Sequence, residues 1–258
     1  MLSATVRCGK SAYSWNINRI FTDKAVISAR ANFEGDTHLI NIQYTGFGLG
    51  KLEAYAYLLD FDNSAANSSA TYGIRFSGAY QMSNDWKLLY AAEYATQDDY
   101  GNNPARLNED YFAGEIGMNF KLSEDISAVT LKFDYELLAG NGTTGFITPL
   151  ATAHAYQGWA DRFLSTPADG IQDWYFTAGA TAFGFNLAAV YHQLSSDHQS
   201  YDYGSEIDLQ VTRKLYEHLT LGLKYSDYNA DANALNVARN GAIAKDVSKF
   251  WAWLEFTY

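Results

Sequence analysis

Cysteine and proline are scarce in this sequence, with one and three residues among 258, and no long apolar run is present. The lone cysteine, Cys8, cannot form an internal disulfide, and low cysteine content suits a protein that passes through the oxidising periplasm. No apolar stretch reaches the roughly 18 residues that a membrane-spanning helix needs, which excludes a helical membrane protein. The first ten residues also lack the basic segment and apolar core of a signal peptide. We therefore expect residues 1–11 to be a frayed or truncated segment whose natural start lies upstream.

Positive charge is also in deficit, because 18 Lys and Arg against 29 Asp and Glu give a formal net charge of -11. Nucleic-acid phosphates call for a basic surface, so a nucleic-acid partner is excluded. The five histidines lie far apart in the sequence. Because they lack the spacing of metal ligands, we predict no metal site and no cofactor.

Aromatic residues, by contrast, are abundant, with 20 tyrosines, 15 phenylalanines and six tryptophans. Such residues are typical of strands and of the aromatic girdles of membrane barrels. Apolar and polar residues alternate through about 12 segments whose length is near the 9 to 11 residues that a tilted strand needs to cross a bilayer. In residues 206–212, for example, Ile207, Leu209 and Val211 alternate with polar residues. Each expected strand therefore has one apolar and one polar face.

The connections between the expected strands alternate in length. Tight turns are expected at residues 46–50, 83–85, 123–125, 183–184 and 215–218. Long polar loops are expected at residues 21–36, 60–69, 96–108, 139–172, 195–203 and 227–246. Outer-membrane barrels place short turns on the periplasmic side and long loops outside. The sequence thus predicts an all-β, antiparallel transmembrane β-barrel of about 12 strands over residues 12–258, with both chain ends in the periplasm.

Two alternatives remain. A soluble carbohydrate-binding β-sandwich also gives alternating strands with regular turns, but its strands are usually shorter and its connections need not alternate in length. A hydrolase built on a barrel would need a nucleophile and a base, and His192 with Ser195 or Ser196 is a candidate pair. Because the sequence identifies no oxyanion donors and no third group, we expect no enzyme activity.

Charged residues of both signs fall on the polar faces of the expected strands, which face the lumen of a barrel. Lumenal charges tune solute selectivity, whereas the lipid face must avoid them. Opposite charges on neighbouring strands also brace a wall, and the sequence leaves both roles open. The predicted pore-lining residues are Lys51, Glu53, Arg75, Lys87, Glu93, Glu115, Lys132, Asp134, Glu136, Glu206, Asp208 and Lys224.

The longest expected loop, residues 139–172, is far less polar than the other loops. Such a loop need not stay in solvent. We expect it either to fold inward and narrow the pore, or to form a short helix on the rim over residues 159–164. The candidates for this constriction are Leu150, His154, Tyr156, Trp159, Asp161 and Arg162.

Four stretches of the sequence carry a resemblance to a known family. They are SWNINRIF from residue 14, AYAYLLDFDNSAANSSATYGIRFSG from residue 54, TPLATAHAYQGWADRFLSTPADG from residue 148 and DYGSEIDLQ from residue 202. Over about residues 12–258 the chain resembles the alginate-export family of outer-membrane porins. The resemblance implies a channel for passive movement of small solutes or anionic saccharides. It also implies that the chain is a C-terminal portion of a larger barrel, although pairing of the strand around Tyr13 with the last strand would still close it.

The last ten residues, KFWAWLEFTY, place Phe250, Leu254 and Phe256 on one face and Trp251 and Trp253 on the other. This aromatic ending resembles the C-terminal assembly signal of outer-membrane proteins. We therefore expect this strand to meet the outer-membrane assembly machinery, and the apolar faces of all the strands to meet membrane lipid and lipopolysaccharide.

Overall fold

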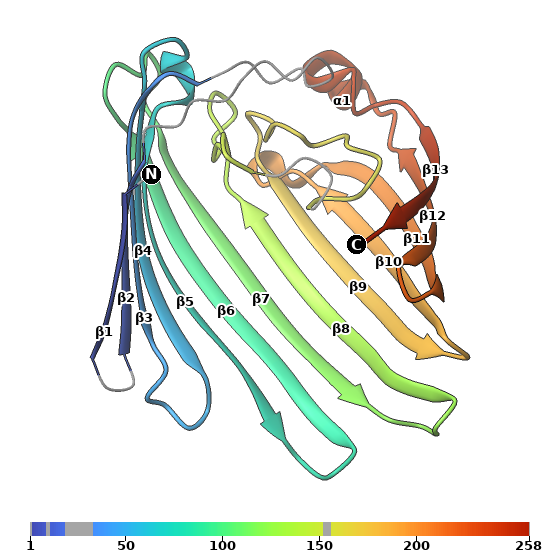
Figure 1. Cartoon of the computed structure of the whole chain (residues 1–258). Coiled ribbons are helices and arrows are strands. Elements are labelled where there is room, and N and C mark those ends of the chain that lie inside the picture. The colour runs from blue at the N-terminus through green and yellow to red at the C-terminus, as the bar shows by residue number, and fades with distance from the viewer. Residues whose placement is uncertain (1, 9–10, 19–32, 152–155, 258) are drawn as a thin grey trace.

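The structure is a computed structural model that describes residues 2–8, 11–18, 33–151 and 156–257. In these residues thirteen strands form one antiparallel sheet, and each strand pairs with its neighbours along the chain (Figure 1). The strands are β1 (Leu2–Cys8), β2 (Ser11–Asn18), β3 (Gly35–Tyr44), β4 (Lys51–Phe61), β5 (Ser69–Gln81), β6 (Trp86–Asp99), β7 (Asn108–Phe120), β8 (Ile126–Leu138), β9 (Ile171–Ala182), β10 (Phe185–Ser195), β11 (Asp202–Tyr216), β12 (Leu219–Ala230) and β13 (Val247–Phe256). One continuous sheet excludes the sandwich, which needs two packed sheets.

Among the described residues, helical structure is confined to short segments in the connections: η1 (Ala65–Asn67), η2 (His198–Ser200) and α1 (Ala234–Asn240). Within the described part of the chain, no helix has the length and apolar character needed to cross a membrane.

The strands have the two faces that the alternation predicts. In β8, Asp134 and Glu136 are 2% and 6% exposed, whereas Phe133 beside them is 49% exposed. In β11, Glu206 is fully buried and Ile207 is 45% exposed. The connection after β8 lies inside the curve of the sheet and bonds to the polar face, so the polar face is the concave one (Figure 1).

The connections alternate in length as predicted. Short ones join β3 to β4, β5 to β6, β7 to β8, β9 to β10 and β11 to β12, and they lie together at one end of the sheet (Figure 1). The tightest is the pair Phe183 and Gly184, both with positive φ, as a two-residue hairpin requires. Long connections, which include residues 139–170 and 231–246, lie at the opposite end.

The two outermost strands each pair on one side only among the described residues. The expected pairing of the strand around Tyr13 with the C-terminal strand is wrong for this part of the chain, because β2 pairs with β1 and β3 whereas β13 pairs with β12. The sheet also has one strand more than the 12 expected. The extra strand is β1, which lies in the N-terminal segment expected to be frayed.

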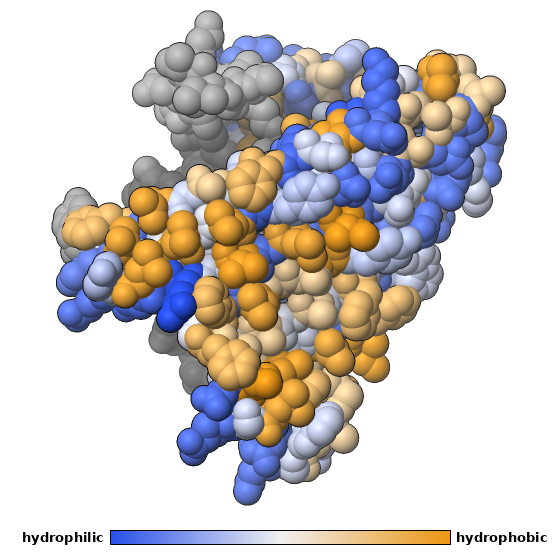
Figure 2. All heavy atoms as spheres, turned by 90° about the vertical axis from the view of Figure 1, so that its right-hand side faces the viewer, coloured by the Kyte–Doolittle hydropathy of each residue, from blue (hydrophilic) through white to orange (hydrophobic). Residues whose placement is uncertain are grey.

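The convex face is apolar and carries aromatic residues near both ends of the strands. Trp86 stacks on Phe120 near the short turns with ring centroids 4.6 Å apart, and Tyr135 meets Trp174 nearer the long loops at 4.2 Å. From Trp86 to Tyr94, which is 48% exposed, β6 rises roughly 26 Å at 3.3 Å per residue. Strand tilt reduces this height to roughly 20 Å, comparable to the apolar band of membrane barrels. Figure 2 shows hydrophobic residues gathered in a broad band, with hydrophilic residues beyond it.

The buried core lies on the concave side near the long connections, between the sheet and the loop that follows β8. Its buried members come from the loop, from the strands around it and, for Ile243, from the connection before β13: Leu138, Phe146, Ala160, Phe163, Ile171, Leu194, Tyr203, Tyr228 and Ile243. This core fixes residues 139–151 and 156–170 against the wall, and so it positions the candidate site.

Candidate functional site

The alternation along each strand places the residues predicted to line the pore on the concave face. The structure brings several of them together as ion pairs. Lys51 lies 2.8 Å from Glu53, and Arg75 lies 2.6 Å from Glu93 on the neighbouring strand. A third ion pair joins Lys132 to Glu115 across β7 and β8. For these six residues the geometry supports bracing of the wall, one of the two roles that the sequence left open.

The remaining wall candidates include three carboxyl groups that hold the loop. Glu206 accepts hydrogen bonds from the Ala160 backbone N–H at 2.6 Å and from the Ser226 hydroxyl at 2.7 Å. Asp208 accepts from the Trp159 backbone N–H at 3.0 Å, and Glu136 accepts from a loop side-chain amide, that of Gln157, at 2.6 Å. These wall carboxyls therefore serve as acceptors for the loop.

Two lysines of the wall also meet the loop. Lys249 of β13 donates to Asp161 at 2.7 Å, and the Lys224 ammonium lies 4.1 Å from the centre of the Trp159 ring. Lys87 also lies on the concave face, but it pairs with Asn119 near the short turns, at the end of the sheet away from the loop.

The constriction candidates on the loop have different positions. Leu150 and Tyr156 remain 40% and 61% exposed, and both line a cavity. Arg162 lies 5.9 Å from the centre of the Tyr228 ring. His154 lies outside the described residues. The expected short helix over residues 159–164 is wrong, because turns and bends replace it. The backbone N–H groups of Trp159 and Ala160 bond to wall carboxyl groups instead.

A glycine makes the close contact between loop and wall possible. Gly158 has φ +87, and a Cβ built on it would lie 2.4 Å from a carboxyl oxygen of Glu206. Any other residue would be strained in this backbone conformation and would collide with the carboxyl group. The loop therefore approaches Glu206 by its bare backbone.

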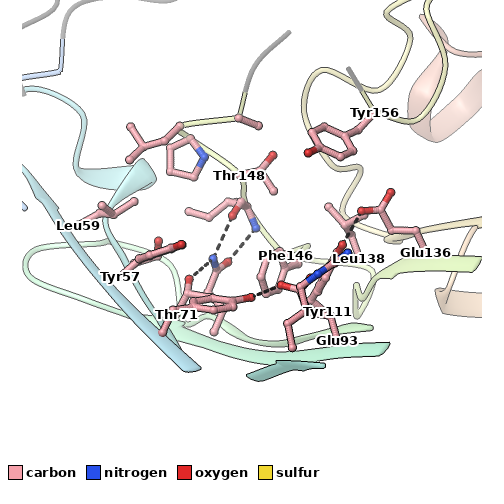
Figure 3. Close-up of a pocket in the computed structure, with 18 of the residues that line it drawn as sticks. Tyr57, Leu59, Thr71, Glu93, Tyr111, Glu136, Leu138, Phe146, Thr148 and Tyr156 are labelled. Atoms are coloured by element: carbon pink, nitrogen blue, oxygen red, sulfur yellow. Dashed lines mark hydrogen bonds and ion pairs between the residues drawn. The ribbon is translucent and has the colours of Figure 1, made fainter. Parts of the chain in front are cut away.

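A cavity of about 890 Å³ lies between the loop and the wall formed by β3 to β8. In Figure 3 the loop residues Thr148 and Tyr156 lie across the cavity from Tyr57, Tyr111 and Glu93 of the wall. On the wall side, the side-chain amide of Gln97 donates to the Ile147 carbonyl and accepts from the Ile147 N–H, at 2.9 and 2.8 Å. Gln97 thus fixes the near edge of the loop while the cavity stays open beside it.

A second set of contacts ties this loop to the other long connections. Asp169, 1% exposed, accepts from two nitrogens of Arg239 at 2.6 and 2.7 Å and from the Tyr201 hydroxyl. The bonds to Asp169 raise the pKa of the Arg239 guanidinium, and burial together with this acceptor raises the pKa of Tyr201. The described parts of this loop, residues 139–151 and 156–170, are therefore held at the rim as well as on the wall.

The hydrolase alternative depended on His192. Its Nδ1 lies 2.8 Å from an oxygen of Asp173, and its Nε2 lies 3.7 Å from Asp208. The Ser196 hydroxyl donates to the His198 carbonyl and accepts from the Tyr201 N–H. His192 is thus held between two carboxyl groups, and the hydroxyl of Ser196, one of the two candidate nucleophiles, bonds to the backbone of the next connection.

The sequence missed Asp173 as the partner of His192, although a signal for it exists. The two-residue turn at Phe183 and Gly184 fixes the register of β9 and β10, so that His192 faces Tyr175. Asp173 then lies diagonally across the strand pair, within reach of a histidine side chain. In the described part of the chain, no three His, Cys, Asp or Glu side chains converge as metal ligands.

Comparisons with known proteins identify the fold. No protein-family model matches the chain, and no curated protein matches it. Among solved structures, OccAB4 of Acinetobacter baumannii matches with a TM-score of 0.68 and 11% identity over 96% of this chain and 62% of that one. OccK7 (OpdD) of Pseudomonas aeruginosa matches with a TM-score of 0.68 and 10% identity over 97% and 65%, and OccK5 (OpdH) of the same organism with 0.67 and 7% over 98% and 70%.

These solved structures are outer-membrane β-barrel porins, and the chain spans about two thirds of their length. Identities this low establish the fold alone. The predicted fold class, an all-β antiparallel transmembrane barrel sheet, is confirmed.

Proposed function

We propose that this chain forms part of the wall of an outer-membrane channel through which small solutes pass without covalent chemistry or a cofactor. The observation that carries the proposal is the placement of residues 139–170 on the concave face. There the loop is bonded to Glu206, Asp208 and Glu136 of the wall instead of extending into solvent. The porin fold and the apolar convex face support an outer-membrane location.

The same loop is proposed to narrow the channel. It crosses from its contact with Gln97 on β6 to its contact with Lys249 on β13. Between these anchors Leu150 and Tyr156 present exposed side chains to the concave side. A loop fixed at both ends of its path sets the width of the passage, because it cannot swing aside without losing several hydrogen bonds.

Anionic saccharides of the alginate type remain a prediction of the family resemblance. The charges of the concave face are mixed, and three of its cations are engaged by carboxylates of the wall, so the face supplies little excess positive charge for a polyanion. We also propose that the convex face meets lipid and lipopolysaccharide, and that β13, whose Phe250, Leu254 and Phe256 are all exposed, meets the assembly machinery.

Single-channel recording in planar bilayers tests the proposal. The whole chain is expected to give stepwise ion conductance, and removal of residues 148–167 is expected to raise that conductance several-fold. A variant with residues 100–107 shortened is the control, since none of these residues lines the cavity. Absence of conductance both from the whole chain and from a version extended upstream would contradict the channel, and an unchanged conductance after removal of residues 148–167 would contradict the constriction.

A further inference from the structure

The cavity between loop and wall has chemistry that selects one kind of solute, and this inference rests on the proposed channel. Its loop side is largely apolar, with Phe146, Ile147, Leu150 and Phe163 among the residues that line it. Small-molecule sites are commonly lined by apolar and aromatic side chains with a few placed polar groups. A cavity of about 890 Å³ falls within the size range of such sites.

The wall side of the cavity presents aromatic rings. Tyr55 and Tyr57 point to the same face of β4, and their rings stack with centroids 4.8 Å apart. Tyr111 of β7 lines the cavity further along the wall, near Phe146 at a ring distance of 5.6 Å. A planar ring entering the cavity would therefore find offset or edge-on partners, which stabilise aromatic pairs beyond the apolar area they bury.

Two carboxyl groups, those of Glu93 and Glu136, are hydrogen-bond acceptors in the cavity lining. Glu93 accepts from the Tyr55 hydroxyl at 2.7 Å and from Arg75 at 2.6 Å. Glu136 accepts from the Tyr111 hydroxyl at 2.7 Å and from Gln157 at 2.6 Å. A carboxylate offers about four lone-pair sites, so both groups can accept another donor. A ligand that donates a hydrogen bond therefore finds an acceptor at either carboxyl group.

The charges and the apolar surface of the cavity narrow the class of ligand further. One guanidinium, that of Arg75, and two carboxyl groups line the cavity, and the guanidinium is bonded to Glu93. A carboxylate ligand would thus meet repulsion. A sugar would bring hydroxyl groups on every side, and those facing Ile147 and Leu150 would lose their water without a partner, which costs free energy.

We propose that this cavity binds uncharged monocyclic aromatic solutes that carry a hydroxyl group, the phenol class, with the ring among Tyr55, Tyr57 and Tyr111 and the hydroxyl donating to Glu93 or Glu136. Bound there, such a solute lies beside the constricting loop on its way through the channel.

Equilibrium titration of the purified whole chain in detergent tests this binding without requiring conductance. The probes are 4-methylphenol, benzoate and glucose, each corrected with a protein-free detergent blank. Saturable binding of 4-methylphenol is expected, with benzoate and glucose at least about tenfold weaker, a difference of about 1.4 kcal/mol. Absence of saturable 4-methylphenol binding would overturn the proposal. Binding of benzoate or glucose as tight as that of 4-methylphenol would also overturn it.

Variants locate the site. Leu150→Trp fills the cavity from the loop side and is expected to weaken 4-methylphenol binding about tenfold or more. Leu215→Trp, near the short turns, is the matched control, since both leucines are about 40% exposed and Leu215 is absent from the cavity lining. Equal binding by these two variants would overturn the assignment. Glu136→Gln, which keeps an acceptor but removes a charge, is expected to bring benzoate binding closer to that of 4-methylphenol.

The outcomes for binding and for the channel are separable. Conductance without 4-methylphenol binding leaves the channel and removes only this inference. Binding of 4-methylphenol without conductance would contradict the proposed channel and leave the binding site in place.

Discussion

The two halves of the concave wall use similar charges in different ways. On β4 to β6, carboxylates are bonded to cations of the wall itself, as in the pairs Lys51 with Glu53 and Arg75 with Glu93. On β11, Glu206 and Asp208 accept instead from the backbone of the loop. On β4 to β6 the ion pairs therefore brace the wall beside the cavity, and Gln97 contacts the edge of the loop. On β11 the carboxyl groups hold the constricting segment directly. The identity of a lumenal charge alone does not reveal which task it performs.

Replacing Gly158 by alanine should have the largest effect, because it disrupts the contact between the loop and Glu206. The new Cβ would meet Glu206 at 2.4 Å in a backbone conformation that only glycine readily adopts, so we expect a loss of about 3 kcal/mol in the free energy of unfolding. Urea unfolding measures the loss, and chymotrypsin should cut the loop near Tyr156 faster than in the parent. Gly179→Ala is the control, because its Cβ would meet only ordinary contacts. Equal losses in the two variants would contradict the anchor.

Glu206→Ala should come next. It leaves the buried N–H of Ala160 and the hydroxyl of Ser226 without their acceptor, and orphaned buried donors cost about 1–3 kcal/mol. Because the substitution also removes an unpaired buried carboxyl oxygen, we expect a net loss of about 2 kcal/mol. Hydrogen exchange should accelerate at Ala160 while the amides of β4 keep their protection. Unchanged exchange at Ala160 would refute the role of Glu206.

Arg75→Ala tests the braced half. Glu93 would keep its bond from Tyr55 but lose the guanidinium. Since Arg75 is partly exposed, solvent screening limits the expected loss to about 1 kcal/mol. The loop should stay as resistant to chymotrypsin as in the parent. Faster cleavage of the loop would show that the two halves are coupled and would weaken the comparison.

Lys51→Ala should have the smallest effect. Its partner Glu53 also accepts from Asn41 and Gln43, at 2.7 and 2.8 Å, so the carboxylate stays satisfied without the lysine. We expect less than about 0.5 kcal/mol in urea unfolding, as is usual for an exposed ion pair. A loss comparable to that of Glu206→Ala would contradict this interpretation.

The sequence predicted the faces of the strands well because alternation is a local signal. The parity of Asp134, Glu136, Glu206 and Asp208 follows from counting along their strands, and the same counting assigned Phe250 and Leu254 to the convex face. The short turns were equally readable, since glycine and polar residues mark them.

Contacts made by the long loop could not be read in this way. The meeting of residues 158–160 with Glu206 depends on the path of a segment without regular structure, and no periodicity encodes that path. The helix expected over residues 159–164 failed for the same reason, because wall carboxyls supply acceptors that an isolated segment would have to find within itself. The partner of His192 was accessible in principle, through the register set by the turn at Gly184.

The loop anchor has a consequence for redesign of this passage. Glu206 and Asp208 grip main-chain amides, those of Ala160 and Trp159, and every amino acid except proline carries such an amide. The Ala160 side chain packs in the buried core but makes none of these hydrogen bonds. A library that varies the side chains at positions 147, 150 and 156 while keeping Gly158 would change the width of the passage without changing the backbone anchor of the loop.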